Sequence, residues 1–410
     1  MPEPSQPAVA LRESSGGAPL GELALFFLRL GTTAFGGPAA HIAIMEDELV
    51  RRRKWLSREK FLDLLGASNL IPGPSSSELA IHIGFLRAGW LGLIVGGVCF
   101  ILPAAILVGA LAWAYVRFGR LPATAALLYG VKPVVIAVIL QALWGLGRAA
   151  IKSKLLAIVG AAGAVLSFLG VNALLLLASA GAAIALAHAT MEKRGPKGAS
   201  NGAMKGNALT LLWRGTRIKL AKAFALTGAA TGIGVAIWPM FLVFLKIGSV
   251  VFGSGYVLLA FLRADLVLHR AWVTDAQLVD AVAVGQVTPG PVFTTATFLG
   301  YLLRGPLGAV VATVGIFLPA FVLVALSGPL VPRIRKSPVA GAFLDGVNAA
   351  SLALMAVVSY QLARASLVDV LTVSLAVASA ILLLRFRTNS AWLVLGGAAA
   401  GVAMKYFRGF

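Results

Sequence analysis

The sequence predicts an all-helical membrane protein with about 10–13 hydrophobic segments, arranged as two homologous halves in inverted topology. Three observations predict this fold class: the composition, the length of the apolar runs and an internal repeat. Of the 410 residues, 59% are hydrophobic and 12% are charged, whereas a soluble domain carries about 25% charged residues. Many apolar runs reach the roughly 20 residues that a helix needs to cross a bilayer, and they lack the alternation of a membrane barrel.

A repeat with an offset of 217 residues divides the chain into two related halves. The segment FFLRLGTTAFGG (26–37) is echoed by VFLKIGSVVFGS (243–254), and NLIPGP (69–74) is echoed by QVTPGP (286–291). The register continues over about 120 residues with a single one-residue deletion. A register of this length indicates a duplication.

The composition along the chain predicts five regions. The amino-terminal stretch is polar and lacks the basic start of a secretory signal, and the link between the halves is strongly basic. One apolar segment ahead of the second half has no counterpart in the first, so we expect it to cross once and invert the second half. The predicted regions are a disordered cytoplasmic tail (1–20), a first repeat (21–190), a basic cytoplasmic linker (191–220), an inverting transmembrane helix (221–238) and a second repeat (239–410).

The basic residues indicate how these regions face the membrane, because basic loops stay cytoplasmic. If the apolar segments on either side of the basic loop 51–54 are re-entrant, this loop stays inside together with the tail and the linker. The rule is then met at almost every loop, which favours the inverted repeat. In the alternative, all thirteen segments span the membrane and the loop lies outside, where four acidic neighbours offset its charge.

Other functional classes lack their sequence signatures. A net charge of +20 raises nucleic acid as a partner, but no basic run is interleaved with aromatic residues, so no nucleic-acid binding is predicted. No P-loop, H-E-x-x-H or G-x-S-x-G pattern appears, which argues against a primary pump or an enzyme; an intramembrane enzyme is the alternative from a different class. No cofactor is predicted. His41 and His82 are isolated, so no metal site is predicted, and the single cysteine, Cys99, cannot form an intrachain disulfide.

The duplicated Pro-Gly-Pro motif is the strongest indication of a transport site. Its prolines end a helix, and broken backbone at membrane depth is tolerated where protein or a wet cavity covers it. The helix that restarts after each motif points free N–H groups into the break. Two breaks meeting from opposite sides of the midplane predict a donor-rich pocket for an oxyanion, the alternative being a simple kink in two buried helices. The predicted binding residues are Asn69, Pro72, Gly73, Pro74, Ser75 and Ser77 in the first copy and Gln286, Thr288, Pro289, Gly290, Pro291 and Thr294 in the second.

Arg29 and Lys246 occupy matching positions inside apolar segments. Cations at membrane depth are costly and suggest function. We predict that they hold the charge of an anion, which the neighbouring Gly36, Gly37 and Gly253 let approach the backbone closely. The alternative is that both side chains snorkel to a membrane face.

Glu78 is the carboxylate that lies well inside the apolar segment 62–85. It is a candidate for proton coupling, the alternative being a hydrogen-bonded structural role. Asp63 and Asp280 also match in the repeat, but they lie near segment starts, where an acidic residue suits a helix N-terminus.

On these motifs the chain resembles the chromate ion transporter family. The resemblance rests on FLRLGTTAFGGPAAHI, WLSREKF and IPGPSSSELAIHIG in the first copy, and on FLKIGSVVFGSGYVLLAF and QVTPGPVFTTATFLGY in the second. It covers nearly the whole chain, in the long, two-domain form of the family. The combination of Phe-Gly-Gly with Pro-Gly-Pro is more specific than either motif alone.

The resemblance implies a multi-pass secondary transporter of the bacterial inner membrane that exports chromate and confers chromate resistance. Sulfate or another oxyanion is the alternative substrate, because sulfate and chromate are both tetrahedral dianions. The implied partners are this dianion and the lipid bilayer, and the glycine-rich segments allow the close packing of a homodimer. The positions that match the family are Arg29, Gly36, Gly37, Asn69, Pro72, Gly73 and Pro74, with Lys246, Gly253, Gln286, Pro289, Gly290 and Pro291 in the second copy.

Overall fold

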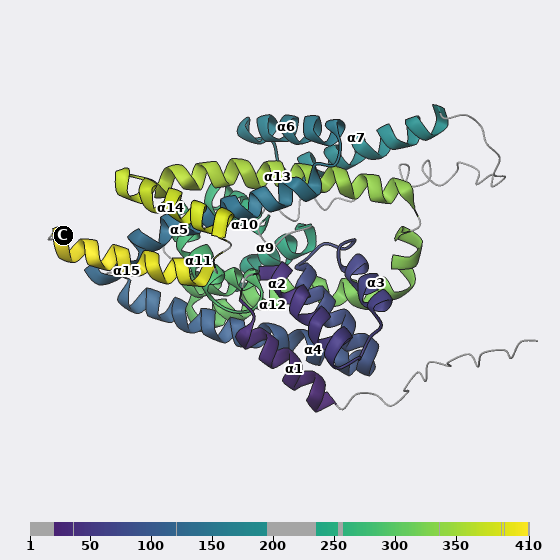
Figure 1. Cartoon of the computed structure of the whole chain (residues 1–410), viewed down its shortest axis with the longest axis horizontal. Helices are drawn as coiled ribbons and strands as arrows, with labels where there is room; N and C mark the ends of the chain where they lie inside the picture. Colours follow the sequence, from purple (N-terminus) through teal and green to yellow (C-terminus); the bar gives the residue numbers. More distant parts are fainter. Residues whose placement is uncertain are drawn as a thin grey trace, which may run out of the picture.

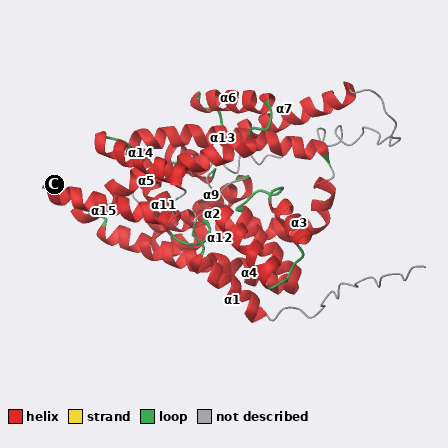
Figure 2. Cartoon of the chain, in the orientation of Figure 1, coloured by secondary structure: helices red, strands yellow, loops and turns green. Residues whose placement is uncertain are grey.

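The computed structural model describes residues 20–35, 37–119, 121–194, 235–252, 257–335, 337–386, 388 and 390–408. Over these residues the chain is a bundle of helices without a strand (Figure 1, Figure 2), which confirms the predicted all-helical class. The predicted tail, most of the linker and most of the inverting helix lie outside the described residues, as do Gly36 and Gly253.

Both halves contain the same series of helices. The first half comprises α1 (Leu20–Thr33), α2 (Gly37–Glu46) with a π-helical extension (Asp47–Arg52), α3 (Arg58–Ser68), α4 (Ser75–Phe118), α5 (Pro122–Ala150), α6 (Lys154–Phe168) and α7 (Ala173–Arg194). The second half comprises α9 (Ile237–Val250), α10 (Leu258–Leu262) with a π-helical extension (Arg263–His269), α11 (Asp275–Val287), a 3-10 turn (Val292–Thr294), α12 (Thr295–Arg335), α13 (Pro338–Ser366), α14 (Val370–Phe386) and α15 (Ser390–Arg408).

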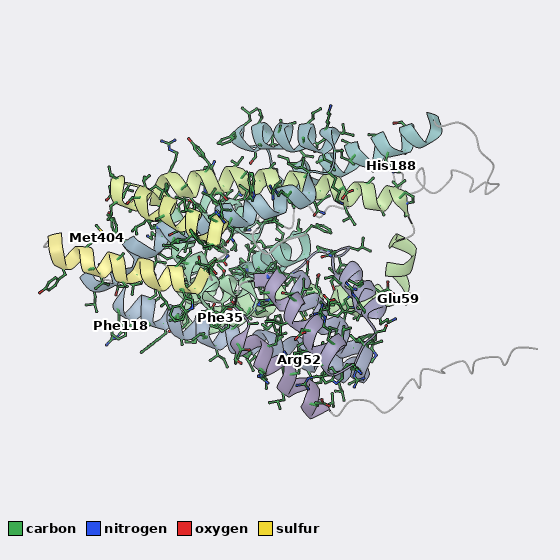
Figure 3. All side chains as sticks on the ribbon, viewed as in Figure 1. Phe35, Arg52, Glu59, Phe118, His188 and Met404 are labelled. Atoms are coloured by element: carbon green, nitrogen blue, oxygen red, sulfur yellow. The ribbon has the colours of Figure 1, made fainter. Side chains whose placement is uncertain are left out.

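The predicted breaks divide the first apolar segments of each half into short helices. α1 has 14 residues, α2 has 10 and α3 has 11, so each falls short of the roughly 20 residues that cross a bilayer. Phe35 lies at the Phe-Gly break of the first half. In Figure 3 it is between the end of the molecule that holds Glu59 and His188 and the end that holds Phe118 and Met404. This arrangement matches the re-entrant prediction and not the alternative of full crossings.

The loops after α2 and α10 repeat their geometry in detail. The α3 N-cap Ser57 accepts the N–H of Lys60, and the matching N-cap of α11, Thr274, accepts the N–H of Gln277 in a capping box. Lys54 and Ala271, which also match, share a positive φ of 53° and 50°. The duplication therefore extends to loop conformation.

α4 and α12 each contain a sharp reversal. Ala88 and Gly89 leave helical geometry inside α4, and the stretches before and after fold back on one another. A Cβ added to Gly84 would lie 2.1 Å from the carbonyl oxygen of Gly92, so the two stretches touch through glycine backbone. Arg304 and Gly305 make the same reversal in α12. The first stretch of α4, residues 75–87, is hereafter called the first half-helix.

Equivalent helices of the two halves run antiparallel. Gly97 of α4 packs against Phe321 on the second arm of α12, after its reversal. Tyr115, farther along α4, stacks edge-on with Phe298 on the first arm, at the level of Thr313, because the adjacent Thr297 contacts Thr313. Along the second arm of α12 the order of contacts is therefore opposite to that along α4. α5 and α13 show the same order, with Lys152 just after α5 contacting Asp345 near the start of α13. The two halves are therefore inverted relative to each other, as predicted.

The halves also exchange their last helices. α5 of the first half packs against α14 and α15 of the second, while α13 of the second half packs against α6 and α7 of the first (Figure 1). Both exchanges use glycine, since Gly130 meets Gly397 and Gly346 meets Ala180 at backbone distance. Among the residues that the structure describes, five helical stretches are long and apolar enough to cross a membrane, so the chain is a multi-pass membrane protein.

Candidate anion-binding site

The two Pro-Gly-Pro breaks meet the opposite half of the molecule. The amide of Gly73 donates to the carbonyl of Val251, at an N···O distance of 2.7 Å, and the amide of Gly290 donates to the carbonyl of Ala34, at 3.0 Å. Gly73 matches Gly290 in the repeat, and Ala34 matches Val251. Each Pro-Gly-Pro motif therefore contacts the Phe-Gly break of the other half, and the four breaks form one central cluster.

Glycine is required at both motifs. Gly73 has a φ of 141° and Gly290 a φ of 91°, which side-chain-bearing residues rarely adopt. A Cβ on Gly73 would also lie 2.3 Å from Oε1 of Glu78, and a Cβ on Gly290 would lie 2.7 Å from Cβ of Ala104. The chain thus approaches its neighbours at both motifs through bare backbone.

His41 joins three of the four breaks, although its isolation in the sequence suggested no role. The side chain is fully buried, with Nε2 3.2 Å from the Ala34 carbonyl oxygen and Nδ1 3.3 Å from Oγ of Ser76. Because a carbonyl oxygen only accepts, Nε2 carries the hydrogen and Nδ1 accepts from the Ser76 hydroxyl. A chain of hydrogen bonds therefore runs from Ser76 through His41 and Ala34 to Gly290.

Ser77 and Glu78 lie in the first turn of the first half-helix and are completely buried. Within the described part of the chain, the Ser77 hydroxyl and both Glu78 carboxyl oxygens have no hydrogen-bond partner. His82, one turn farther along on the same side as Glu78, also has an unpartnered Nε2 there. Buried polar groups without partners are unusual. The unpartnered atoms of this half-helix are therefore available to hydrogen-bond a ligand or water.

The Pro-Gly-Pro break of the second half, hereafter the second break, offers fewer free donors than that of the first half, the first break. The hydroxyls of Thr288 and Thr294 donate to backbone carbonyls of their own segment, those of Val284 and Pro291, at 3.0 and 2.8 Å. Because these bonds use their hydrogens, in this conformation the two hydroxyls are not the free donors that the predicted donor-rich pocket needs. The amide nitrogen of Gln286 is unpartnered among the described residues, and Gln286 is 8% exposed. Its counterpart Asn69 is exposed, so the two breaks differ in access.

Arg29 lies on the exposed face of its helix, whereas Lys246 is half-buried and paired with an acidic side chain. The buried stripe of α1 consists of Leu23, Phe26, Phe27, Leu30 and Gly31, and Arg29 points away from it. Arg29 is exposed and forms no ion pair with the described residues. Lys246 Nζ lies 2.7 Å from Oδ1 and 2.9 Å from Oδ2 of the buried Asp265. The structure does not bring these two cations to the breaks.

A third cation, Lys132, was missed by sequence reasoning. Its Nζ lies 3.1 Å from Oδ1 of Asp280, a charge contact whose alignment falls short of a hydrogen bond. The hydroxyl of Tyr115 donates to the other oxygen of Asp280 at 2.9 Å. Asp280 lies well inside α11 and is 3% exposed, so the predicted role as an N-terminal acid is wrong. Lys132 sits beside Pro133 in α5, a combination that gave no recognisable motif.

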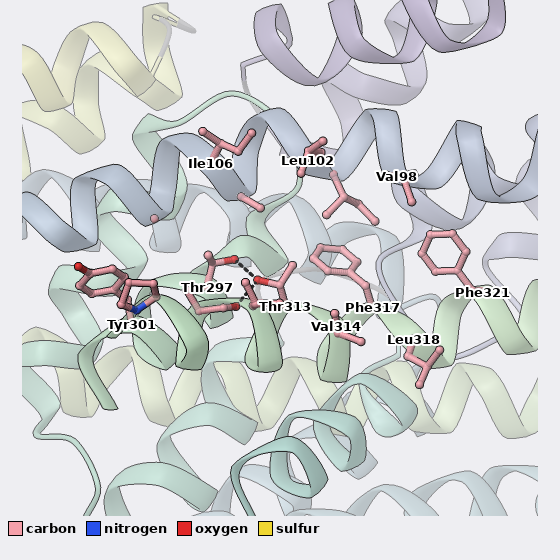
Figure 4. Close-up of a pocket in the computed structure, with 16 residues that line it drawn as sticks. Val98, Leu102, Ile106, Thr297, Tyr301, Thr313, Val314, Phe317, Leu318 and Phe321 are labelled. Carbon is pink, nitrogen blue, oxygen red and sulfur yellow. Dashed lines mark hydrogen bonds between the residues drawn. The ribbon is translucent and has the colours of Figure 1, made fainter. Parts of the chain in front are cut away.

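An apolar groove of about 560 Å³ lies between α4 and α12 (Figure 4). Its polar groups include Thr297 and Thr313, whose hydroxyl oxygens are 2.7 Å apart, and Thr313 donates to the carbonyl of Ala309. Leu102 and Ile106 on its rim are 46% and 63% exposed. A groove lined by apolar side chains does not suit a dianion.

Metal ligands do not gather in the described part of the chain. No group of three His, Cys, Asp or Glu side chains there is placed to hold a metal ion. The polar groups at the breaks include amides, hydroxyls and a carboxyl.

Comparison with known proteins identifies the relatives of this chain. The family model described as chromate transporter matches residues 21–186 and 238–402, which are the two halves. The chain is 34% identical to a chromate transport protein of Cupriavidus metallidurans, over 97% of both chains. It is 32% identical to a probable chromate transport protein of Synechococcus elongatus, over 86% of this chain and 87% of the relative. A chromate transport protein of Pseudomonas aeruginosa is also 32% identical, over 86% of this chain and 84% of the relative. No solved structure was found to match the chain.

Proposed function

Because the chain belongs to the chromate transporter family, we propose that it is a secondary transporter that exports chromate across the bacterial inner membrane and so confers chromate resistance. The observation that carries this proposal is the reciprocal pairing of the breaks, Gly73 with Val251 and Gly290 with Ala34. Interrupted helices that meet near the middle of an inverted repeat are the usual substrate site of secondary transporters.

A tetrahedral dianion needs several donors and a close approach to backbone. The breaks supply glycine backbone and the half-helix N-terminus, whose N–H groups favour anions. The proposed contacts are Asn69, Pro72, Gly73, Pro74, Ser75 and Ser77 from the first half and Gln286, Thr288, Pro289, Gly290, Pro291 and Thr294 from the second, with Gly36, Gly37 and Gly253 next to them. Ser77 and Gln286 are the strongest among them, because each holds an unpartnered polar atom.

The proposed transport cycle alternates access between the two halves. Asn69 at the first break is exposed while Gln286 at the second is buried. In an inverted repeat, the opposite conformation exchanges these environments. The exposure of Asn69 supports the proposal that this conformation is open on the side of the first break.

Glu78 is proposed to couple transport to protons. Both of its oxygens are buried, and no cation or donor among the described residues compensates a charge there. A carboxylate so placed is costly, whereas a protonated carboxyl is tolerated. Since Glu78 covers Gly73 at the first break, its protonation state acts on the proposed substrate path directly.

Everted membrane vesicles test direction, energy source and substrate together. An exporter that faces the cytoplasm in cells accumulates labelled chromate inside energised everted vesicles, and an uncoupler abolishes the accumulation. A vesicle preparation with Gly73→Ala, checked for membrane insertion, gives the matched control. Accumulation in right-side-out vesicles would reverse the proposed direction. Sulfate uptake without chromate uptake would move the substrate to the alternative oxyanion.

A further inference from the structure

Lys132 and Asp280 form a buried ion pair between the two halves. Lys132 comes from α5 of the first half, Asp280 from α11 of the second, and Tyr115 of α4 completes the group. The Asp280 side chain is 4% exposed and that of Lys132 is 23% exposed. The cation is thus the more accessible member, and the carboxylate depends on it for charge compensation.

This ion pair lies on the helix that leads into the second break. Asp280 precedes Gln286 by six residues, which is about 9 Å along α11. Gln286 also lines a small cavity with Ile139, two turns along α5 from Lys132. The two helices therefore connect the ion pair with the unpartnered amide of Gln286.

The repeat does not place a second lysine at the position that matches Lys132. The repeat places Asp63 opposite Asp280, but Asn348 opposite Lys132. The second break alone therefore has a lysine at this position. Arg29 is exposed and Lys246 is hydrogen-bonded to both oxygens of Asp265, whereas Lys132 contacts one oxygen of Asp280 without an aligned hydrogen bond. Lys132 is therefore the cation on this side that an anion can recruit most easily.

We propose that Lys132 binds the transported oxyanion, and that Asp280, its partner in the unloaded protein, takes up a proton from solvent as the anion displaces it. This inference rests on the proposed anion transport. The ammonium group stays charged throughout, and the carboxylate gains one proton because a buried carboxylate without its cation is costly. Lys132 and Tyr115 are the titratable groups that contact Asp280. No cation among the described residues pairs with Glu78, so anion binding frees no charge there.

Binding of chromate to the purified full-length protein in nanodiscs, measured between about pH 7.5 and 9, where chromate stays the dianion, tests the exchange. The wild type is expected to bind one proton with each anion, so that affinity falls by up to about tenfold per pH unit on the alkaline side. Lys132→Gln is expected to weaken binding at least about tenfold, and Lys132→Arg to restore part of it. Asp280→Asn, which mimics the protonated acid, is expected to bind with little pH dependence. Lys152→Gln breaks a surface ion pair between the halves and serves as the matched control.

The outcomes separate this inference from the proposed function. Wild-type affinity and pH slope in Lys132→Gln would overturn the role of Lys132, and an unchanged slope in Asp280→Asn would overturn the proton exchange. Should Asp280→Asn fail to fold, Tyr115→Phe is expected to move the pH dependence to higher pH, because the carboxylate loses a donor; an unmoved profile would count against the exchange. A wild type that binds neither chromate nor sulfate would overturn the proposed function and this inference together.

Discussion

The amide of Gly73 donates a hydrogen bond to the carbonyl of Val251 across the interface between the two halves, at an N···O distance of 2.7 Å. The equivalent bond joins Gly290 to Ala34. Buried backbone groups must be paired, and the Pro-Gly-Pro motif leaves an amide that its own half does not satisfy. Each half therefore satisfies the hydrogen bonding of the broken backbone in the other half. A change at one break alters a hydrogen bond of the opposite break.

Alanine at Gly73 or Gly290 is expected to abolish transport. Each substitution combines an unfavourable φ with a Cβ that meets a neighbour within 2.7 Å. Vesicle transport and the thermal midpoint in detergent measure the two effects. Gly89→Ala is the matched control, because Gly89 also has a positive φ, of 58°, but its Cβ would meet open space. The expected cost of Gly89→Ala is about 1–3 kcal/mol, because a ψ of −143° places Gly89 outside the left-handed helical region. Equal losses in all three variants would mean that backbone strain, and not contact at the breaks, explains the effect.

The breaks and the duplication could be predicted because their signals are local. Proline and glycine change the backbone wherever they occur, so the ends of α1, α3, α9 and α11 followed from short motifs. The inverted arrangement followed from the basic loops. The tight reversal at Ala88 and Gly89 was predicted only as a gap between two segments, since nothing in the sequence indicated that the two stretches pack together.

The partners of individual side chains could not be predicted, because they come from distant parts of the chain. His41 contacts Ser76, 35 residues away, and Tyr115 contacts Asp280, 165 residues away. A single sequence contains no signal for such pairs. The orientation of Arg29 was accessible in principle, since the apolar stripe of α1 leaves it on the opposite face.

Phenylalanine at His41 is expected to slow transport by roughly tenfold while the protein still folds. The ring keeps its volume and its edge-on contact with Phe100, at a centroid distance of 5.3 Å, but both hydrogen bonds are lost. Leaving the buried Ser76 hydroxyl without its partner costs about 1–3 kcal/mol, which lowers the thermal midpoint as well. His188→Phe, at an exposed position of α7, controls for the added ring. Unchanged transport in His41→Phe would remove His41 from the coupled breaks.

Glutamine at Glu78 is expected to separate exchange from net transport. The amide fills the same space over Gly73 but cannot give up a proton, so chromate exchange between equal solutions continues while accumulation driven by a proton gradient is lost. Both are measured in the same vesicles. Glu59→Gln, on the exposed side of α3, is the control. Gradient-driven accumulation at the wild-type rate in Glu78→Gln would assign Glu78 a structural role.

The matched loop ion pairs are expected to contribute unequally to stability. Arg263 binds Asp275 at 2.7 and 3.1 Å and also donates to Gln361, whereas the charge-reversed counterpart, Arg58 with Glu46, is 3.6 Å apart and Arg58 is 75% exposed. A bidentate, part-buried ion pair contributes more to folding stability than an exposed ion pair does. Arg263→Gln is therefore expected to lower the thermal midpoint clearly, and Arg58→Gln to change it little. Equal shifts would contradict this ranking.

Substitutions that remove the charge of Arg29 or Lys246 are expected to have different effects, although the sequence predicts that both residues hold the charge of an anion. Arg29 is exposed and has no ion pair among the described residues, so Arg29→Gln is expected to keep the wild-type thermal midpoint. Slower transport in this variant would then indicate that Arg29 contacts the anion. Lys246→Gln leaves Asp265 buried without its cation, which destabilises the protein. Adding Asp265→Asn to Lys246→Gln then restores the thermal midpoint. If that double variant is stable but still inactive, Lys246 contacts the substrate at another stage of the cycle; if it transports normally, Lys246 serves only to neutralise Asp265.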